Sequence, residues 1–118
     1  HDGNIDLKID FLQRVDEAIG HMWKMFTDVH KQRVVFVVTG DHSTPCYYKD
    51  HSFEPVPMLV CGNYAGAHKV ADRVTRFEEL DNGGFLGRFP GLETMKIIRN
   101  YQQVTAKLDE ELDSATTL

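Results

Sequence analysis

Cysteine is scarce in this chain, long apolar runs are missing, and acidic residues outnumber basic ones. The two cysteines, Cys46 and Cys61, cannot form a disulfide framework, and their spacing matches no zinc-knuckle pattern. We therefore expect a reducing, cytoplasmic compartment. No apolar stretch approaches the ~18 residues of a membrane span, and no signal peptide is visible, so we expect no membrane partner.

The charge balance argues against a further class of partner. Lysine and arginine number 13 against 18 acidic residues, giving a net charge of −5, which does not favour nucleic-acid binding. A dense anionic substrate would have to be met by local cations or metal ions. With 42% hydrophobic and 26% charged residues, the composition is that of a folded protein. Because the sequence starts with His1 rather than Met, we expect a processed product or a piece of a longer protein.

The hydrophobic pattern predicts two long helices and two short strands. Apolar residues recur at steps of three, four or seven near both ends of the chain, as on one face of a helix. The predicted helices span Ile5–His30 and Gly91–Leu112, with a short helix at Val70–Leu80, and the predicted strands span Val34–Thr39 and Pro57–Cys61.

The first strand indicates the fold class. Val34–Val38 is an uninterrupted run of branched and aromatic residues, which is typical of a strand buried on both faces in a parallel sheet. The order helix, strand, loop, strand, loop, helix makes an α/β protein. Since two strands alone make a poor parallel sheet, we expect these elements to complete a larger sheet.

Polar residues follow the first strand, where α/β proteins bind ligands. Asp41 and His42 come directly after it, and His51 lies in the same loop. On an extended backbone Asp41 and His42 should point to opposite sides, so that the pair could serve two neighbouring ions. His1 should stand near the same end of the sheet. Three imidazoles and one carboxylate suit zinc or manganese more than calcium, although an Asp-His pair is also common in turns and caps.

Five stretches, in this order, resemble one enzyme family. They are His1–Gly3, Thr39–Cys46, Lys49–Ser52, Pro55–Pro57 and Gly84–Arg88. The middle ones resemble the C-terminal metal-binding segment of cofactor-independent phosphoglycerate mutases of the archaeal-type branch, within the alkaline phosphatase superfamily. The resemblance covers about the first hundred residues. It implies a partial alkaline-phosphatase-like sheet with flanking helices, in which residues 1–112 belong to the metal-binding domain and 113–118 form a frayed tail.

The same resemblance implies roles for individual residues. Asp41 and His42 would bind one divalent ion, and His1 and His51 the other, the ions being Mn, Mg, Zn or Co. The family's enzymes interconvert 3-phosphoglycerate and 2-phosphoglycerate, a step of glycolysis and gluconeogenesis, through a phosphoserine intermediate. The nucleophilic serine and the other metal ligands lie N-terminal to such a segment. The chain alone should then be inactive, with the remaining N-terminal part of the protein as its partner.

Two cations are candidates for substrate binding. Lys49, in the polar loop, could approach a phosphate or carboxylate, although a solvated loop lysine is as good an interpretation. Arg88, in the glycine-rich loop 81–91, could hold an anion by bidentate contacts, the alternative being a surface arginine. The acidic run Asp109–Glu111 is most simply a solvated helix face.

Two other functions are compatible with the sequence. One is a different phosphotransferase or hydrolase of the alkaline phosphatase superfamily, because the residues that choose the substrate are not in this chain. The other belongs to a different class, namely a non-catalytic interaction domain that retains the metal ligands as part of its structure.

Overall fold

The computed structural model describes residues 1–80 and 83–116, and these residues form two compact units. The first unit comprises residues 1–32 and 40–56. The second comprises residues 33–39 and the described residues from 57 onward. Each unit is described by itself below.

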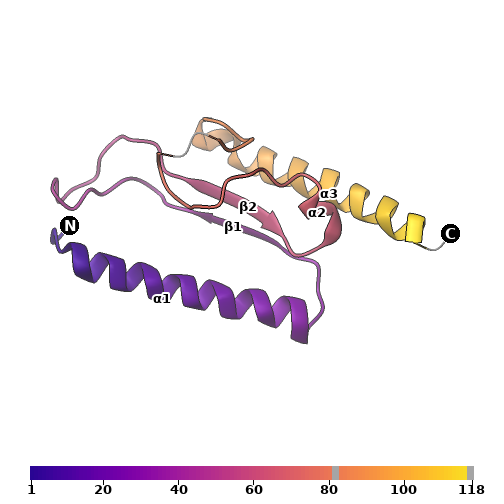
Figure 1. The fold of residues 1–118 in the computed structure, drawn as a ribbon. Helices are drawn as coiled ribbons and strands as arrows, with labels where there is room; N and C mark the ends of the chain where they lie inside the picture. The colour runs from indigo at the N-terminus through magenta and orange to yellow at the C-terminus, as the bar shows by residue number, and fades with distance from the viewer. Residues whose placement is uncertain (81–82, 117–118) are drawn as a thin grey trace. The chain divides into compact units, whose positions relative to one another are not determined.

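The first unit is built around helix α1, Ile5–Lys24, which continues as a π-helical turn, η1, over Met25–Val29 (Figure 1). Asn4 caps its start, because the side-chain Oδ1 accepts a hydrogen bond from the backbone N–H of Leu7 at 3.1 Å. The helix predicted for Ile5–His30 is therefore present over nearly all of its length. Only its last turn differs, having widened from α to π geometry.

The apolar face of α1 is exposed within this unit. None of its residues is buried. The large apolar side chains that remain more than half exposed are Ile5, Leu7, Phe11 and Leu12, at 61%, 64%, 66% and 56%. An amphipathic helix normally buries this stripe against another layer of structure. The first unit supplies no such layer among its described residues.

The second unit contains a two-stranded antiparallel sheet of β1, Val35–Thr39, and β2, Met58–Gly62. The parallel arrangement expected from the apolar run is wrong. Such a run indicates burial on both faces but not strand direction, and the loop between the strands contains no helix that could form a parallel crossover. Hydrogen bonds of 2.9 Å hold both ends of the pair: the N–H of Val34 donates to Asn63 Oδ1, and Thr39 Oγ1 to the carbonyl of Pro57.

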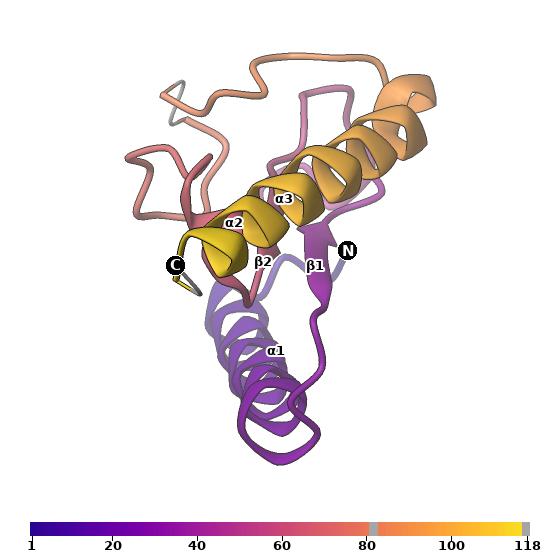
Figure 2. The ribbon, with the colours of Figure 1, turned by 90° about the vertical axis from the view of Figure 1, so that its right-hand side faces the viewer.

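Two helices complete the second unit, α2 over Ala65–His68 and α3 over Thr94–Thr116, the latter preceded by the 3-10 turn η2 at Gly91–Glu93. Figure 2 shows the short α2 lying against α3. Gly66 allows this approach, because a Cβ at this position would collide with the backbone of Thr105 and Asp109. Tyr64 strengthens the contact through a 2.6 Å hydrogen bond between its hydroxyl and that of Thr105.

Buried groups are few among the described residues. Ala67 is the one buried hydrophobic residue, and Thr105 and Asp109 are the buried polar ones. Asp109 is 4% exposed, so the interpretation of its acidic run as a solvated face is wrong at this position. Both cysteines are free, and partial burial raises the pKa of the Cys61 thiol. No described helix is long and apolar enough to cross a bilayer.

The segment between α2 and η2 also differs from expectation. The helix predicted for Val70–Leu80 is absent, and this stretch forms bends instead. Asp72 organises it: its carboxylate accepts 3.0 Å hydrogen bonds from the N–H groups of Val74 and Phe85. Within the glycine-rich loop, residues 81–82 lie outside the described part of the chain. The final helix continues past its predicted end at Leu112 to residue 116. Residues 117–118 of the predicted tail lie outside the described part of the chain.

Candidate metal centre

The loop of residues 40–56 brings two of the predicted ligands together. An antiparallel bridge joins Ser43 and Ser52, in which the N–H of Ser52 donates to the carbonyl of Ser43 at 2.9 Å. The Ser43 hydroxyl adds a 3.1 Å hydrogen bond to the carbonyl of Glu54. This bridge places His42 next to His51, and their rings stack with centroids 3.5 Å apart.

Residues at the start of the chain reach the same loop. Gly3 has a φ of +71°, a conformation that favours glycine and reverses the chain just before the cap of α1. The Lys8 ammonium then donates to the carbonyl of Thr44 at 2.8 Å, and His1 Nδ1 lies 3.3 Å from the carbonyl oxygen of Lys49. Two contacts therefore tie the N-terminal turn to the loop.

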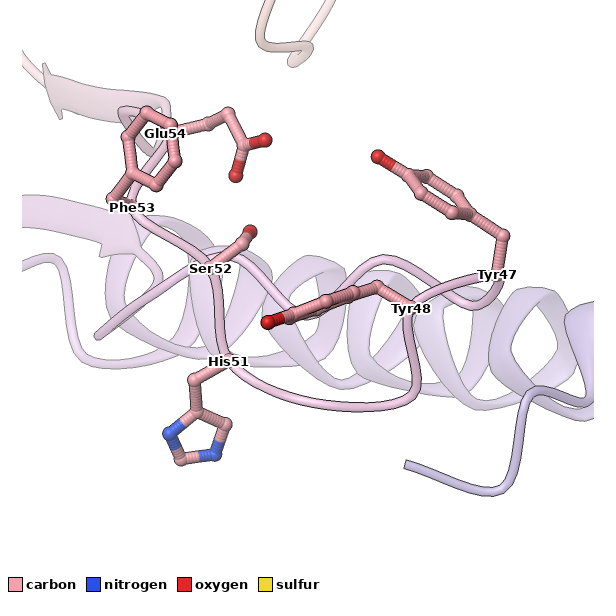
Figure 3. A pocket seen from close by; sticks show the side chains of 6 residues that line it. All are labelled: Tyr47, Tyr48, His51, Ser52, Phe53 and Glu54. Carbon is pink, nitrogen blue, oxygen red and sulfur yellow. The ribbon is translucent and has the colours of Figure 1, made fainter.

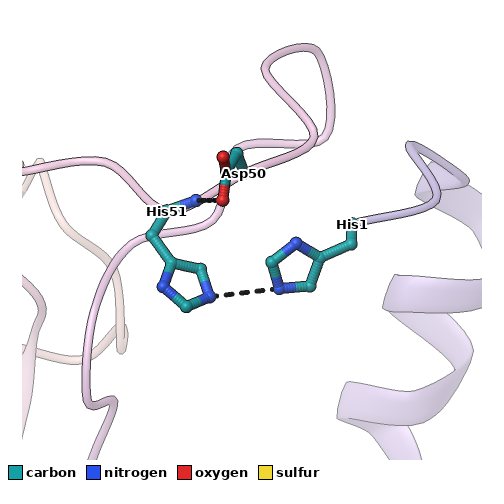
Figure 4. Close-up of side chains that lie close together, drawn as sticks. All are labelled: His1, Asp50 and His51. Atoms are coloured by element: carbon teal, nitrogen blue, oxygen red, sulfur yellow. Dashed lines mark hydrogen bonds between the residues drawn. The ribbon is translucent and has the colours of Figure 1, made fainter.

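His1 and His51 meet at their ring nitrogens. Their Nε2 atoms are 3.1 Å apart, and Figure 4 shows the two imidazoles facing each other across this contact. Two nitrogens bound to one tetrahedral ion at ~2.0–2.1 Å would be separated by roughly 3.4 Å. The pair therefore fits the ligand spacing of a single zinc-type ion with only a small adjustment.

Asp50 is a candidate ligand that the sequence interpretation missed. Ligand atoms of His1, Asp50 and His51 all lie within 4.8 Å of one another, and all three residues are exposed. The Asp50 carboxylate already accepts a 2.8 Å hydrogen bond from the N–H of His51, as Figure 4 shows. Its position directly before a predicted ligand was the available signal.

Asp41 and His42 form a second pair of possible ligands. Asp41 Oδ2 lies 3.2 Å from His42 Nε2, so the expectation that the two side chains point to opposite sides is wrong. The chain bends here instead of running extended, and Asp41 Oδ1 accepts a 3.0 Å hydrogen bond from the N–H of His42. His42 Nδ1 lies 3.1 Å from Thr44 Oγ1, which fixes the ring. The pair faces one point and could share one ion.

The two predicted substrate-binding cations have different surroundings. Lys49 contributes its backbone to the His1 contact, and its side chain passes beside Gly3. Arg88 is exposed and belongs to the second unit. The role of each in binding an anion stays a prediction.

Two pairs of nitrogen and oxygen donors, adjacent through stacked imidazoles, make a centre suited to divalent ions. Residues 1–101 match the family model of the metalloenzyme superfamily. The chain belongs to this superfamily. Membership implies divalent metal binding, and the mixed α/β structure with flanking helices is consistent with a part of an alkaline-phosphatase-like fold.

Three curated relatives of this chain are named phosphoglycerate mutases. The chain is 39% identical over 99 residues to 2,3-bisphosphoglycerate-independent phosphoglycerate mutase 1 of Methanocaldococcus jannaschii, covering 83% of this chain and 22% of the relative. It is 37% identical over 112 residues to the Pyrobaculum aerophilum mutase, covering 93% and 25%. For the Sulfolobus acidocaldarius mutase the identity is 36% over 103 residues, covering 86% and 23%.

The chain therefore spans about a quarter of the length of the curated relatives it matches. No solved structure matches it.

Proposed function

We propose that this chain is the C-terminal metal-binding part of a phosphoglycerate mutase that interconverts 3-phosphoglycerate and 2-phosphoglycerate. One observation carries the proposal: the Asp41–His42 pair, at 3.2 Å, and the His1–His51 pair, at 3.1 Å, lie side by side through the stacked rings of His42 and His51. Each pair has the spacing of two ligands on one ion. Relatives that match 83% and 93% of this chain are named phosphoglycerate mutases.

In this function each pair holds one divalent ion, which is manganese, magnesium, zinc or cobalt. Asp50 is placed to add a carboxylate to the ion at His1 and His51. Such ions neutralise phosphoryl oxygens and favour the deprotonated form of a bound hydroxyl. Lys49 and Arg88 are the residues of this chain that would bind the anionic groups of phosphoglycerate.

The remaining N-terminal part of such an enzyme is the partner that this function requires. About three quarters of the length of the relatives lies outside the match, since the chain covers 22% to 25% of them. That part would supply the serine nucleophile and the missing metal ligands, and a layer to cover α1. We place the enzyme in the cytoplasm and in glycolysis, and we expect the chain alone to be inactive.

A segment exchange tests this function. Replacing the matching segment of the Methanocaldococcus jannaschii mutase with this chain should give a protein that converts 3-phosphoglycerate to 2-phosphoglycerate when manganese is supplied. Because metal ligands are essential for such chemistry, His51→Ala in the hybrid should lower kcat/KM by roughly 100-fold or more. His21→Ala, on the exposed surface of α1, is the matched control and should retain activity.

Two results would contradict the proposal. Turnover by the isolated chain would show that it does not need the remaining part. A hybrid that folds and binds manganese, but hydrolyses other phosphate esters instead of shifting the phosphoryl group, would place the chain with a different phosphotransferase or hydrolase.

A further inference from the structure

The segment 51–54 borders a cavity on the side away from the His1–His51 pair. In Figure 3 the His51 ring projects to one side of the backbone, and the Ser52 hydroxyl projects to the other. On the Ser52 side lies a cavity of about 480 Å³. Its lining residues are Tyr47, Tyr48, His51, Ser52, Phe53 and Glu54. All belong to one loop of the first unit.

The aromatic side chains of this cavity are unusually open to solvent. Phe53 is 97% exposed, Tyr47 85% and Tyr48 58%. Single exposed apolar residues are ordinary, but a cluster around a hollow is typical of a binding surface. Aromatic rings present a negative face, which attracts cations and planar groups.

A carboxylate completes the cavity. Figure 3 shows the Glu54 carboxylate directed into the same space as the Ser52 and Tyr47 hydroxyls. The Ser52 hydroxyl lowers the pKa of the Glu54 carboxyl, and the backbone amide of Glu54 adds to this effect. Glu54 is therefore charged at neutral pH.

The ligand chemistry follows from this combination. The lining contains no lysine or arginine, and the His51 ring turns away, so an anion such as a phosphate would meet only a like charge. A cation would meet a carboxylate and three aromatic rings. A guanidinium group fits better than an ammonium, because it is planar, stacks on aromatic rings and pairs with a carboxylate through two parallel hydrogen bonds.

We propose that the cavity lined by Tyr47, Tyr48, Phe53 and Glu54 is a docking pocket for an arginine side chain of another polypeptide segment. The occupied pocket holds residues 51–54 from the side opposite the histidine pair. Docking therefore also positions His51, without the arginine touching the metal centre. The inference rests on the loop alone and does not depend on which phosphate ester the enzyme uses.

Titration of the 118-residue chain with three short peptides tests the pocket. Acetyl-Gly-Arg-Gly-amide should shift the backbone amide resonances of residues 47–54, and the matching glutamine peptide should not. The lysine peptide should bind more weakly than the arginine peptide. Glu54→Gln and Tyr47→Ala should each weaken the arginine peptide by roughly threefold to tenfold, because each removes one element of cation recognition. Phe77→Ala is the matched control, since Phe77 is a 53% exposed aromatic of the second unit.

Several outcomes would overturn the proposal. Two of them are equal shifts with the glutamine peptide and equal affinity for the lysine peptide. A third is the absence of any shift up to about 10 mM arginine peptide, because a Kd above this concentration is weaker than that of most specific contacts. An unchanged affinity in Glu54→Gln would also overturn it. The amide spectrum of each variant reports whether the loop is still folded, so a loss of binding by misfolding is recognised.

Discussion

At the scale of single residues, local contacts leave Nε2 of the His1 ring and Nε2 of the His51 ring facing each other. His1 Nδ1 lies against the Lys49 carbonyl, whereas the backbone N–H of His51 donates to Asp50 Oδ1 and the His51 ring stacks on His42. His1 has the arrangement common in metal-binding histidines, with one ring nitrogen engaged and the other directed at the ion. The local contacts therefore pre-orient the groups of the proposed metal site.

Metal addition tests this proposed site. Zinc or manganese should raise the melting temperature of the chain with increasing concentration, because binding to the folded state alone adds about 2.7 kcal/mol when the ion is at 100 times its Kd. His51→Ala should abolish most of the rise, and Asp50→Asn should reduce it if Asp50 is a ligand. Differential scanning fluorimetry measures the shift. His21→Ala serves as the control, and a loss equal to that of His51→Ala would exclude the histidine pair as the site.

The sequence interpretation proposed several residues of this candidate centre. The order of the stretches around His1 and His51 was enough to propose that they share an ion, and the 3.1 Å contact is compatible with that proposal. The orientation of Asp41 was not predictable from alternation along a strand, because its carboxylate bonds to the next backbone N–H and bends the chain. Local side-chain contacts of this kind leave no periodic pattern.

At the scale of secondary-structure elements, one buried carboxylate joins three parts of the second unit. Asp109 of α3 lies 2.7 Å from the Arg33 guanidinium, just before β1, and accepts a 3.1 Å hydrogen bond from the N–H of Gly66 in α2. Arg33 also pairs with Asp113 at 3.0 Å, but that side chain is 69% exposed. The two aspartates share a partner and differ in burial, which makes them a natural pair for comparison.

Removing the buried carboxylate should cost more stability than removing the exposed one. Asp109→Ala leaves the Gly66 N–H and part of the Arg33 charge unpaired, so it should lower the free energy of unfolding by about 2–3 kcal/mol. Asp113→Ala should lower it by less than ~1 kcal/mol, as for exposed ion pairs. Urea unfolding followed by circular dichroism measures both. Equal losses would mean that the ion pairs, and not burial, control the docking of α3.

The elements themselves were predictable to different degrees. Helical spacing of apolar residues located α1 and α3, and the two strands were placed within a residue of their observed bounds. Strand direction was not predictable from composition. The region of Val70–Leu80 has a mixed pattern, and its bends depend on Asp72 contacts with residues as distant as Phe85. Asp109 was taken for a surface residue because burial of a charge depends on Arg33, 76 positions away.

At the scale of the whole molecule, the main feature is apolar surface without a core. Phe11 and Leu12 of α1 are 66% and 56% exposed, while the buried hydrophobic residues that the structure describes reduce to Ala67. A helix of this pattern is stabilised chiefly by burying its apolar face. The face of α1 is therefore where the proposed N-terminal part of the enzyme should add its layer.

If the N-terminal part of the enzyme covers α1, a substitution on its apolar face should have different effects in the isolated chain and in the hybrid enzyme. In the isolated chain, Phe11→Glu changes a side chain that is already in solvent, so the free energy of unfolding should change by less than ~0.5 kcal/mol. In the hybrid with the remaining part of the Methanocaldococcus jannaschii mutase, the same change would bury an unpaired carboxylate. The substitution should then lower the free energy of unfolding of the hybrid by about 2–4 kcal/mol and reduce the folded yield.

Glu17→Gln, on the polar face of α1, is the matched control and should leave both proteins unchanged, as thermal unfolding of the four variants would show. An equal effect of Phe11→Glu in both contexts would mean that α1 stays in solvent in the complete enzyme. Since an exposed apolar stripe of this length gives a helix little stability in water, such a result would require another binding partner for α1. A large effect in the hybrid alone would identify the remaining part of the enzyme as the layer that covers this helix.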